Sequence, residues 1–412
     1  MRKVLVVLLI LSVMGGAFAQ EGSWSVGAKA EIGAIVDFKA KEALKGATTS
    51  GTGYHAKEYY DGLMGALSVS YNRGGLNISL GFNQYEQFGY GAEAYVSYAG
   101  DFFTFKFGGD IVKFLSSPDI EERDLELWGT FNLFKGIMAL EISHFSGNDK
   151  TRWTTENFIQ GKSEKWSGAN LGDDAGGVLG NRSGLITEFN IIDGLNVGFY
   201  MPRLFDIGGY DIAGFKGYPE NQPAWDLMED AVKQTIMGVT FSMFDNFGVS
   251  AAFDFGKSYF LLTGKVTNLF KLMGVGFFID ANFKSSFTMD IGLSVEFSGN
   301  NWGAALGALF YGVGTGDGNL AVKLFPQFYY HIFPNSLAFL LDVQIDLKGN
   351  SDIFFAIEPQ IFINFKGDGI STNYYWPMNT GLHVRYTWRN TGAWTSWPTN
   401  VNALEIIFRW SM

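Results

Sequence analysis

The chain contains no cysteine and only four histidines among its 412 residues. Disulfide bonds and thiolate metal sites are therefore excluded. With so few histidines, no Ser–His–acid triad can be assembled from the spacing of residues. The segment 314–319 resembles a calcium or phosphate loop, but it lacks the other ligands. We therefore expect no catalytic residue, no metal ligand and no cofactor.

Charged residues are also scarce, and one sign prevails. They make up 17 % of the chain, against ~25 % in ordinary soluble domains, and the formal net charge is -11. A protein that binds nucleic acid needs a basic surface, so we expect no nucleic-acid partner. Beyond residues 4–14 there is no long apolar run, which excludes helical membrane spans.

The amino-terminal residues resemble a secretory signal peptide. Arg2 and Lys3 precede the apolar run 4–14, and Ala17-Phe18-Ala19 fits the small-x-small cleavage pattern before Gln20. The alternative is an uncleaved anchor. We predict a signal peptide at residues 1–19 and a mature domain at residues 20–412, whose net charge would be -13 because the removed segment holds two bases and no acid.

Aromatic residues are abundant, at 17 % of the chain with 39 phenylalanines, and they follow a period of two. At the carboxyl end, Leu404, Ile406, Phe408, Trp410 and Met412 alternate with mostly polar residues. A β-strand that faces lipid on one side and water on the other requires this alternation. We therefore interpret the last residues as the closing strand of a β-barrel.

Similar segments of about ten residues, the span of a tilted membrane strand, recur along the whole chain. We predict an all-β, antiparallel up-and-down barrel of about 20 strands, with 16 to 20 accepted. The predicted strand centres lie near residues 31, 66, 80, 94, 106, 129, 141, 188, 199, 239, 251, 264, 278, 292, 307, 326, 342, 359, 383 and 407. Tight Asn-, Gly- and Asp-rich turns alternate with longer connections, of which the longest candidates are 39–60, 111–124, 147–183, 205–232 and 389–401. We expect the short turns on the periplasmic side and the long loops outside.

This alternation of strands, short turns and long loops resembles the bacterial outer-membrane porins. The resemblance covers the mature chain and rests on pattern, and the last aromatic residue, Trp410, stands two positions before the end. It implies a protein of the bacterial outer membrane, embedded in the lipid bilayer. Because the residues assemble no catalytic constellation, we do not expect an enzyme. The implied function is a channel for passive diffusion of small hydrophilic solutes or ions, and the channel could be a homo-oligomer.

Other functions remain open at this point. The loops 147–183 and 205–232 could bind a ligand or a host surface, which would make the protein an adhesin, and a barrel enzyme is a further possibility. A soluble exported β-sandwich shares the period of two, but it would not explain about 20 strands with short turns on one side.

Charged residues on the polar faces of the predicted strands are the candidates for a pore lining. The acidic candidates are Asp290, Glu296, Asp342, Asp346 and Glu358, and the basic candidates are His383, Arg385, Arg389 and Arg409. They could form opposed walls across a water-filled lumen, which would orient and filter solutes, or they could pair locally across neighbouring strands. From the acidic set and the expected mature charge of -13 we expect a mild cation preference, which the substitution Arg385→Glu should strengthen.

Overall fold

The computed structural model describes residues 22–38, 42–46, 63–85, 89–110, 125–134, 137–144, 153–154, 178–179, 184–202, 232–233, 235–243, 246–256, 258–283, 287–313, 320–348, 353–370, 379–390 and 401–412. The predicted signal peptide at 1–19 lies outside these residues, as do most of the loops 147–183 and 205–232. Among the residues described, no helix is long and apolar enough to cross a membrane.

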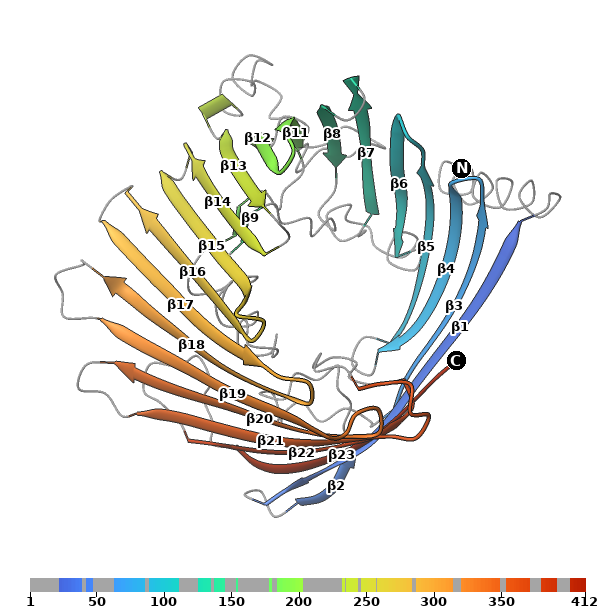
Figure 1. Ribbon diagram of the computed structural model, residues 1–412. Helices are drawn as coiled ribbons and strands as arrows, with labels where there is room; N and C mark the ends of the chain where they lie inside the picture. Colours follow the sequence, from blue (N-terminus) through green and yellow to red (C-terminus); the bar gives the residue numbers. More distant parts are fainter. Residues whose placement is uncertain are drawn as a thin grey trace, which may run out of the picture. The chain divides into compact units, whose positions relative to one another are not determined.

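The described chain is built of β-strands (Figure 1). They are β1 (Ser23–Asp37), β2 (Glu42–Gly46), β3 (Leu63–Arg73), β4 (Leu76–Tyr85), β5 (Gly89–Ala99), β6 (Phe103–Asp110), β7 (Leu125–Leu133), β8 (Met138–His144), β9 (Trp153–Thr154), β10 (Val178–Leu179), β11 (Gly184–Ile192), β12 (Leu195–Pro202), β13 (Ile236–Met243), β14 (Phe247–Asp254), β15 (Tyr259–Leu269), β16 (Met273–Asn282), β17 (Thr288–Ser298), β18 (Trp302–Val313), β19 (Ala321–Phe333), β20 (Leu337–Lys348), β21 (Phe354–Asn364), β22 (Gly381–Arg389) and β23 (Val401–Ser411). Every strand centre predicted from the sequence falls inside one of the long strands.

Three short strands were not predicted. β2 lies inside the expected loop 39–60 and pairs with β1, while β9 and β10 lie inside the expected loop 147–183 and pair with each other. Alternation over two to five residues is too brief to reveal a strand in a sequence.

The strands pair in the order of the chain, and the registered pairs are antiparallel. A single sheet of 21 strands includes all of them except β9 and β10, and the last strand, β23, pairs with β1 from Lys29↔Ser411 to Asp37↔Ala403. This is the topology of an antiparallel up-and-down barrel, because the last strand returns to the first and leaves no free edge there. The predicted fold class is confirmed.

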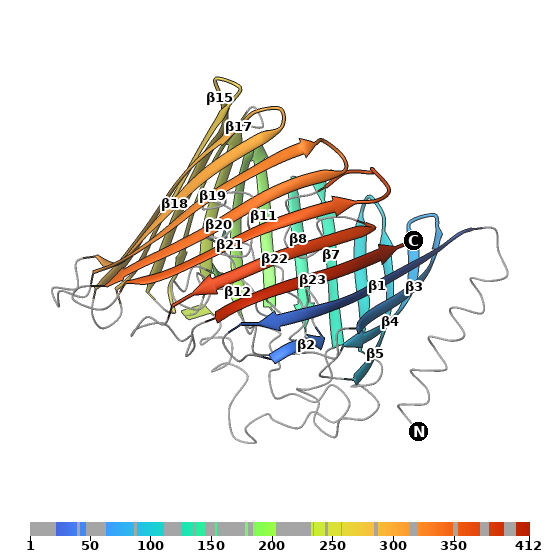
Figure 2. The same ribbon diagram turned by 90° about the horizontal axis from the view of Figure 1, so that it is seen from below.

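By its contacts the chain divides into two compact units. The first contains β4–β8, β11, β12, β3 from Gly65 onward and the residues of β1 before Lys29. The second contains β2, β9, β10 and β13–β23, with β1 from Lys29 onward and the first two residues of β3, except that Ile236 and Met237 of β13 belong to the first. In the second unit, the strands β18–β23 and then β1 lie side by side (Figure 2). The candidate site residues all belong to this second unit.

The turn between β15 and β16 has an unusual backbone. Phe270 and Lys271 have positive φ angles of 52° and 63°, and the amide of Leu272 donates a hydrogen bond to the carbonyl of Leu269 at 3.1 Å. Two consecutive positive φ values define a type I′ hairpin turn, which normally favours Asn and Gly. Two residues with bulky side chains occupy this turn instead.

We expect Lys271→Gly to raise the free energy of unfolding by about 0.5–1 kcal/mol. A left-handed conformation costs an L-residue about 1–2 kcal/mol, and the greater flexibility of glycine in the unfolded chain offsets about 0.5–1 kcal/mol of the gain. Urea unfolding of the refolded protein in vesicles would measure the change. Lys271→Ala is the control, because alanine keeps the Cβ atom and should give no gain; a gain from both variants would locate the effect in the lost charge.

Candidate functional site

The two faces of the sheet in the second unit carry opposite kinds of side chain. Along β20, Asp342, Gln344 and Asp346 are buried, with at most 3 % of each exposed, whereas the intervening Val343 is apolar and partly exposed. Soluble proteins show the reverse arrangement, with apolar side chains buried and charged ones exposed. The distribution is that of a protein whose outer surface contacts lipid.

The neighbouring strands repeat this inverted arrangement. Large apolar side chains between 38 % and 50 % exposed occupy the open face of the second unit, and they include Leu293, Phe297, Leu306, Phe328, Tyr330, Ile361, Ile406, Phe408 and Trp410. A soluble monomer rarely exposes a contiguous apolar patch above a few hundred Å². This face therefore requires an apolar environment.

Most of the charged residues singled out in the sequence share the buried face. Asp342, Asp346, Glu358, His383, Arg385 and Arg409 are fully buried there. Asp290 and Glu296 share the face and are partly exposed. Arg389 lies in β22, but its side chain is outside the described part of the structure. The predicted orientation of these residues follows from the strand period; whether they line an ion path stays a prediction.

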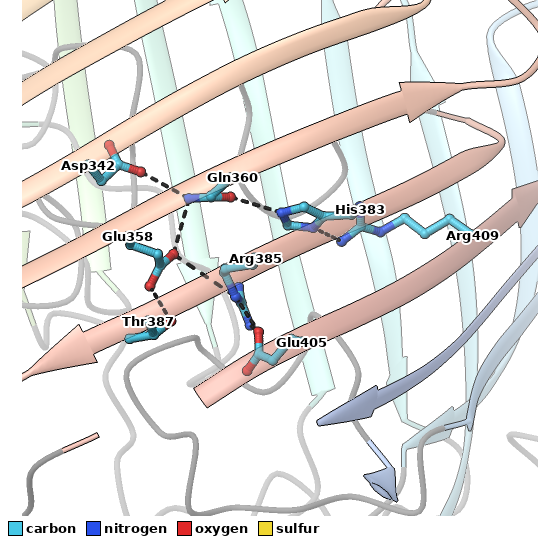
Figure 3. Close-up of polar contacts among 8 residues, drawn as sticks. All are labelled: Asp342, Glu358, Gln360, His383, Arg385, Thr387, Glu405 and Arg409. Carbon is cyan, nitrogen blue, oxygen red and sulfur yellow. Dashed lines mark hydrogen bonds and ion pairs between the residues drawn. The ribbon is translucent and has the colours of Figure 1, made fainter. Parts of the chain in front are cut away.

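His383 stands at the centre of a chain of hydrogen bonds (Figure 3). Arg409 donates through Nη2 to His383 Nδ1 at 3.2 Å, because a guanidinium nitrogen can only donate. The other ring nitrogen, Nε2, then carries the proton and donates to Gln360 Oε1 at 2.9 Å. Gln360 Nε2 in turn donates to Asp342 Oδ2 at 3.1 Å and to Glu358 Oε1 at 3.0 Å. The ring of His383 also stacks on Phe362, with centroids 4.5 Å apart.

Arg385 forms the second part of the network. It stands directly opposite Glu405 in the β22–β23 ladder, and its Nε and Nη2 atoms contact Glu405 Oε2. Its Nε atom also lies 4.0 Å from Glu358 Oε1, and Glu358 accepts a bond from Thr387 Oγ1 at 2.9 Å. One arginine therefore links two buried carboxylates on the strands to either side of it.

These contacts favour local pairing over separate acidic and basic walls. Arg385 lies between the carboxylates of Glu358 and Glu405, and Gln360 links His383 and its partner Arg409 to Asp342, so part of the charge on this face is neutralised locally. Buried charges are tolerated only when they are paired and hydrogen-bonded in this way. We call the set Asp342, Glu358, Gln360, His383, Arg385, Thr387, Glu405 and Arg409 the buried charge network.

Some members of this wall were not singled out from the sequence. Glu405 is the direct partner of Arg385, while Lys323 and Gln327 lie on the same face of β19, opposite Asp346 and Asp342. Gln327 Nε2 donates to Asp342 Oδ1 at 2.5 Å. The period of two in their strands could have placed them on this face, but the partners depend on the register between strands.

The connection after β21 is held by an aspartate outside the strands. Asp368 accepts hydrogen bonds from Asn364 Nδ2 at 2.7 Å and from Asn379 Nδ2 at 3.0 Å. These two bonds, the first above all, together with the nearby Lys366 ammonium, hold the pKa of Asp368 below its usual value. Lys366 Nζ also donates to the Ser411 carbonyl at 3.0 Å and so ties this connection to the end of β23.

We expect Asp368 to add acid sensitivity to the barrel. Because its folded pKa is depressed, its stabilising contribution is present above the unfolded value of ~3.9 and is lost as pH falls through the folded pKa. Midpoints of urea unfolding at pH 6, 4 and 3 should therefore fall less for Asp368→Asn than for the native chain, with Asn379→Ala between them. The same fall in all three proteins would assign the acid sensitivity to other carboxylates.

Comparison with known proteins finds likeness in structure only. No family model and no curated protein matches the sequence. Similar solved structures include OccK11 (OpdR) of Pseudomonas aeruginosa, with 8 % identity, a TM-score of 0.45 and coverage of 95 % of this chain and 96 % of that chain. OccK5 (OpdH) of the same organism has 10 % identity and a TM-score of 0.44, and the match covers 95 % of this chain and 98 % of that chain. OccAB3 of Acinetobacter baumannii has 9 % identity and a TM-score of 0.43, and the match covers 95 % of this chain and 99 % of that chain.

Because these identities and TM-scores are low, the fold of this chain is established by its own strand pairing and not by the comparison. The sheet returns from its last strand to its first, one face exposes large apolar side chains, and the other buries charged ones. These are the features of an outer-membrane β-barrel.

Proposed function

We propose that the protein is a channel for passive diffusion of small hydrophilic solutes across the bacterial outer membrane. The observation that carries the proposal is the polar face of the sheet opposite the apolar exposed one. Part of that polar face is open to solvent in the second unit, since Lys265 is exposed and Asp290 and Glu296 are partly exposed. We place the water-filled path along β15–β17, because the side chains of the buried charge network on β20–β23 are closed to solvent.

Carboxylates outnumber fixed cations on this face. Asp342, Asp346, Glu358 and Glu405 are buried there with Lys323, Arg385 and Arg409, and the more open residues add Asp290 and Glu296 against Lys265. Together with the expected mature charge, this supports a mild preference for cations over anions.

Single-channel recording in planar bilayers tests the proposal. We expect discrete conductance steps and a reversal potential in a KCl gradient that indicates mild cation preference. The preference should shrink at high salt, because the screening length falls from ~10 Å at 0.1 M to ~3 Å at 1 M. Refolded, heat-modifiable protein that inserts into the bilayer and never conducts would refute the channel.

The location and processing of the chain belong to the same proposal. Membrane fractionation should place the mature protein, beginning at Gln20, in the outer membrane, with residues 1–19 removed. Recovery as a freely soluble periplasmic protein would contradict the barrel in its membrane role. Cross-linking of the folded protein would test whether it forms a homo-oligomer.

We propose neither an adhesin nor an enzyme. The adhesin alternative rests on segments 147–183 and 205–232, of which the structure describes little beyond β9 and β10, so no described contact favours it. Replacing each of the four histidines singly should leave transport intact, apart from a modest change in selectivity at His383. If one replacement abolished a measurable hydrolytic activity, that result would favour the enzyme.

A further inference from the structure

After β21 the chain turns back onto the buried face of the sheet. Ile370 lies six residues beyond the end of this strand, yet only 9 % of it is exposed. It belongs to one buried apolar cluster with Tyr329 of β19, Ala338 and Leu340 of β20 and Phe362 of β21. By the period of two, these four residues share the face of the buried charge network, since Gln327, Asp342 and Gln360 are buried two residues further along the same strands. We call residues 365–370 the inward strap.

The position of Ile370 requires a reversal of the chain. At ~3.3 Å per residue, a chain that continued in the direction of β21 would carry Ile370 about 20 Å past Asn364, the last residue of the strand. Instead, Ile370 clusters with Phe362, two residues before the end of the strand, and with Leu340, which stands opposite Gln360. The strap therefore covers part of the inner wall, as far as the Phe362 ring that stacks on His383.

Asn364 holds this reversal with its buried side chain. Its Oδ1 atom accepts hydrogen bonds from the backbone amides of Lys366 at 2.9 Å and Gly367 at 3.2 Å, and its Nδ2 atom donates to the Gly369 carbonyl at 2.6 Å. An asparagine that bonds the backbone two and three residues ahead makes an Asx-type turn. The φ angles of Gly367 and Gly369 are 68° and 115°, a region that glycine enters without a steric penalty.

Backbone bonds fix the strap to the neighbouring strands as well. The amide of Phe365 donates to the Thr380 carbonyl at 3.0 Å, just before β22 begins. Ser411 Oγ, at the end of β23, donates to the Asn379 carbonyl at 3.0 Å. With bonds on both sides and a buried apolar residue, the strap is a packed element of the inner wall.

We propose that the inward strap is a constriction that limits the size of the solutes passing through the channel, with Ile370 as the residue that seats it. Backbone that lies against the inner wall occupies space that water would otherwise fill, and the diameter of a pore is a main determinant of its selectivity. The constriction rests on the proposed channel function, whereas the packing of Ile370 against the wall can be tested without it.

Thiol labelling tests the packing of the strap. Because the chain has no cysteine, Ile370→Cys introduces its sole thiol, and cysteine is small and apolar enough to remain in the cluster. In the folded protein in detergent, we expect a charged, water-soluble maleimide to modify Ile370→Cys at least about tenfold more slowly than Asn335→Cys, because the buried thiol must await local opening. Asn335 is the matched control, since it is exposed in the neighbouring turn between β19 and β20. Adding Asn364→Ala to Ile370→Cys should remove most of this protection.

Channel recordings test the constriction. We expect Asn364→Ala and Ile370→Ser each to increase the single-channel conductance and to admit larger polyethylene glycols than the native chain does. Asn335→Ser is the control and should behave as the native chain. Ile370→Ser loses the apolar contact but keeps the turn that Asn364 holds, so it provides the test even if Asn364→Ala does not fold.

The outcomes separate the strap from the channel. Equal labelling rates at Ile370→Cys and Asn335→Cys would overturn the inward packing. A protected thiol in a conducting protein, with conductance and polymer exclusion unchanged in Asn364→Ala and Ile370→Ser, would show that the strap only braces the wall and would overturn the constriction alone. A protected thiol in a protein that inserts and never conducts would refute the channel, and the constriction with it, while the packing of Ile370 would stand.

Discussion

Replacing Arg385 by methionine is expected to destabilise the folded barrel by about 3–5 kcal/mol. The substitution removes the cation that lies between Glu405 and Glu358 and leaves two buried carboxylates without it. Arg385→Glu should be worse, because it brings a third carboxylate into the same dry space. Loss of folding stability should therefore be the main effect of Arg385→Glu, rather than the stronger cation preference that the sequence alone suggests.

Urea unfolding in lipid vesicles would measure this loss of stability. A difference in gel mobility between unheated and heated samples would check that the barrel has formed. Lys265→Met is the control, because Lys265 is an exposed cation on the same face and its loss should change stability by less than ~1 kcal/mol. The double variant Arg385→Met/Glu405→Leu should recover part of this stability, because it also removes one of the two buried carboxylates that lose their cation. A cost below ~1 kcal/mol for Arg385→Met would mean that this wall is hydrated.

Placing an arginine at Val343 is the second large effect, with an expected cost of about 2–4 kcal/mol. Val343 lies on the apolar face of β20, between Leu341 and Ile345, where a charged side chain would have to enter the hydrocarbon. An arginine at the next position, Gln344, should cost far less. Gln344 already donates to both carboxylate oxygens of Asp346, at 2.6 and 2.7 Å, so a guanidinium there finds an ionic partner.

The same vesicle unfolding assay compares the two arginine variants. The comparison is informative because the positions are adjacent in sequence and differ only in the face of the strand. Equal costs at Val343 and Gln344 would show that the assignment of faces is wrong.

The fold could be predicted from the sequence because it depends on local alternation. A strand between lipid and a polar interior must alternate at a period of two, and each of about 20 segments repeats that signal. The sequence-based centre near residue 342, for example, lies inside β20, and the faces of Asp342 and Val343 follow directly. Short pairings such as that of β2 with β1 were not predicted, because the period of two cannot be recognised over five residues.

Only part of the candidate site could be predicted from the same alternation. Alternation correctly grouped His383, Arg385 and Arg409 on one face, but it left open whether they oppose the acidic residues across a lumen or pair with them. Pairing depends on which residues stand opposite one another, and this register is set by turn geometry and by the fit of whole strands.

By itself, then, the sequence determined the strand order, the membrane-facing residues and the presence of charges on the other face, since each follows from a period of two along one strand. Only the tertiary structure decided that Arg385 meets Glu405 and that Gln360 links His383 to two carboxylates. The physical reason is that a contact between strands depends on register, and register joins residues far apart in the chain.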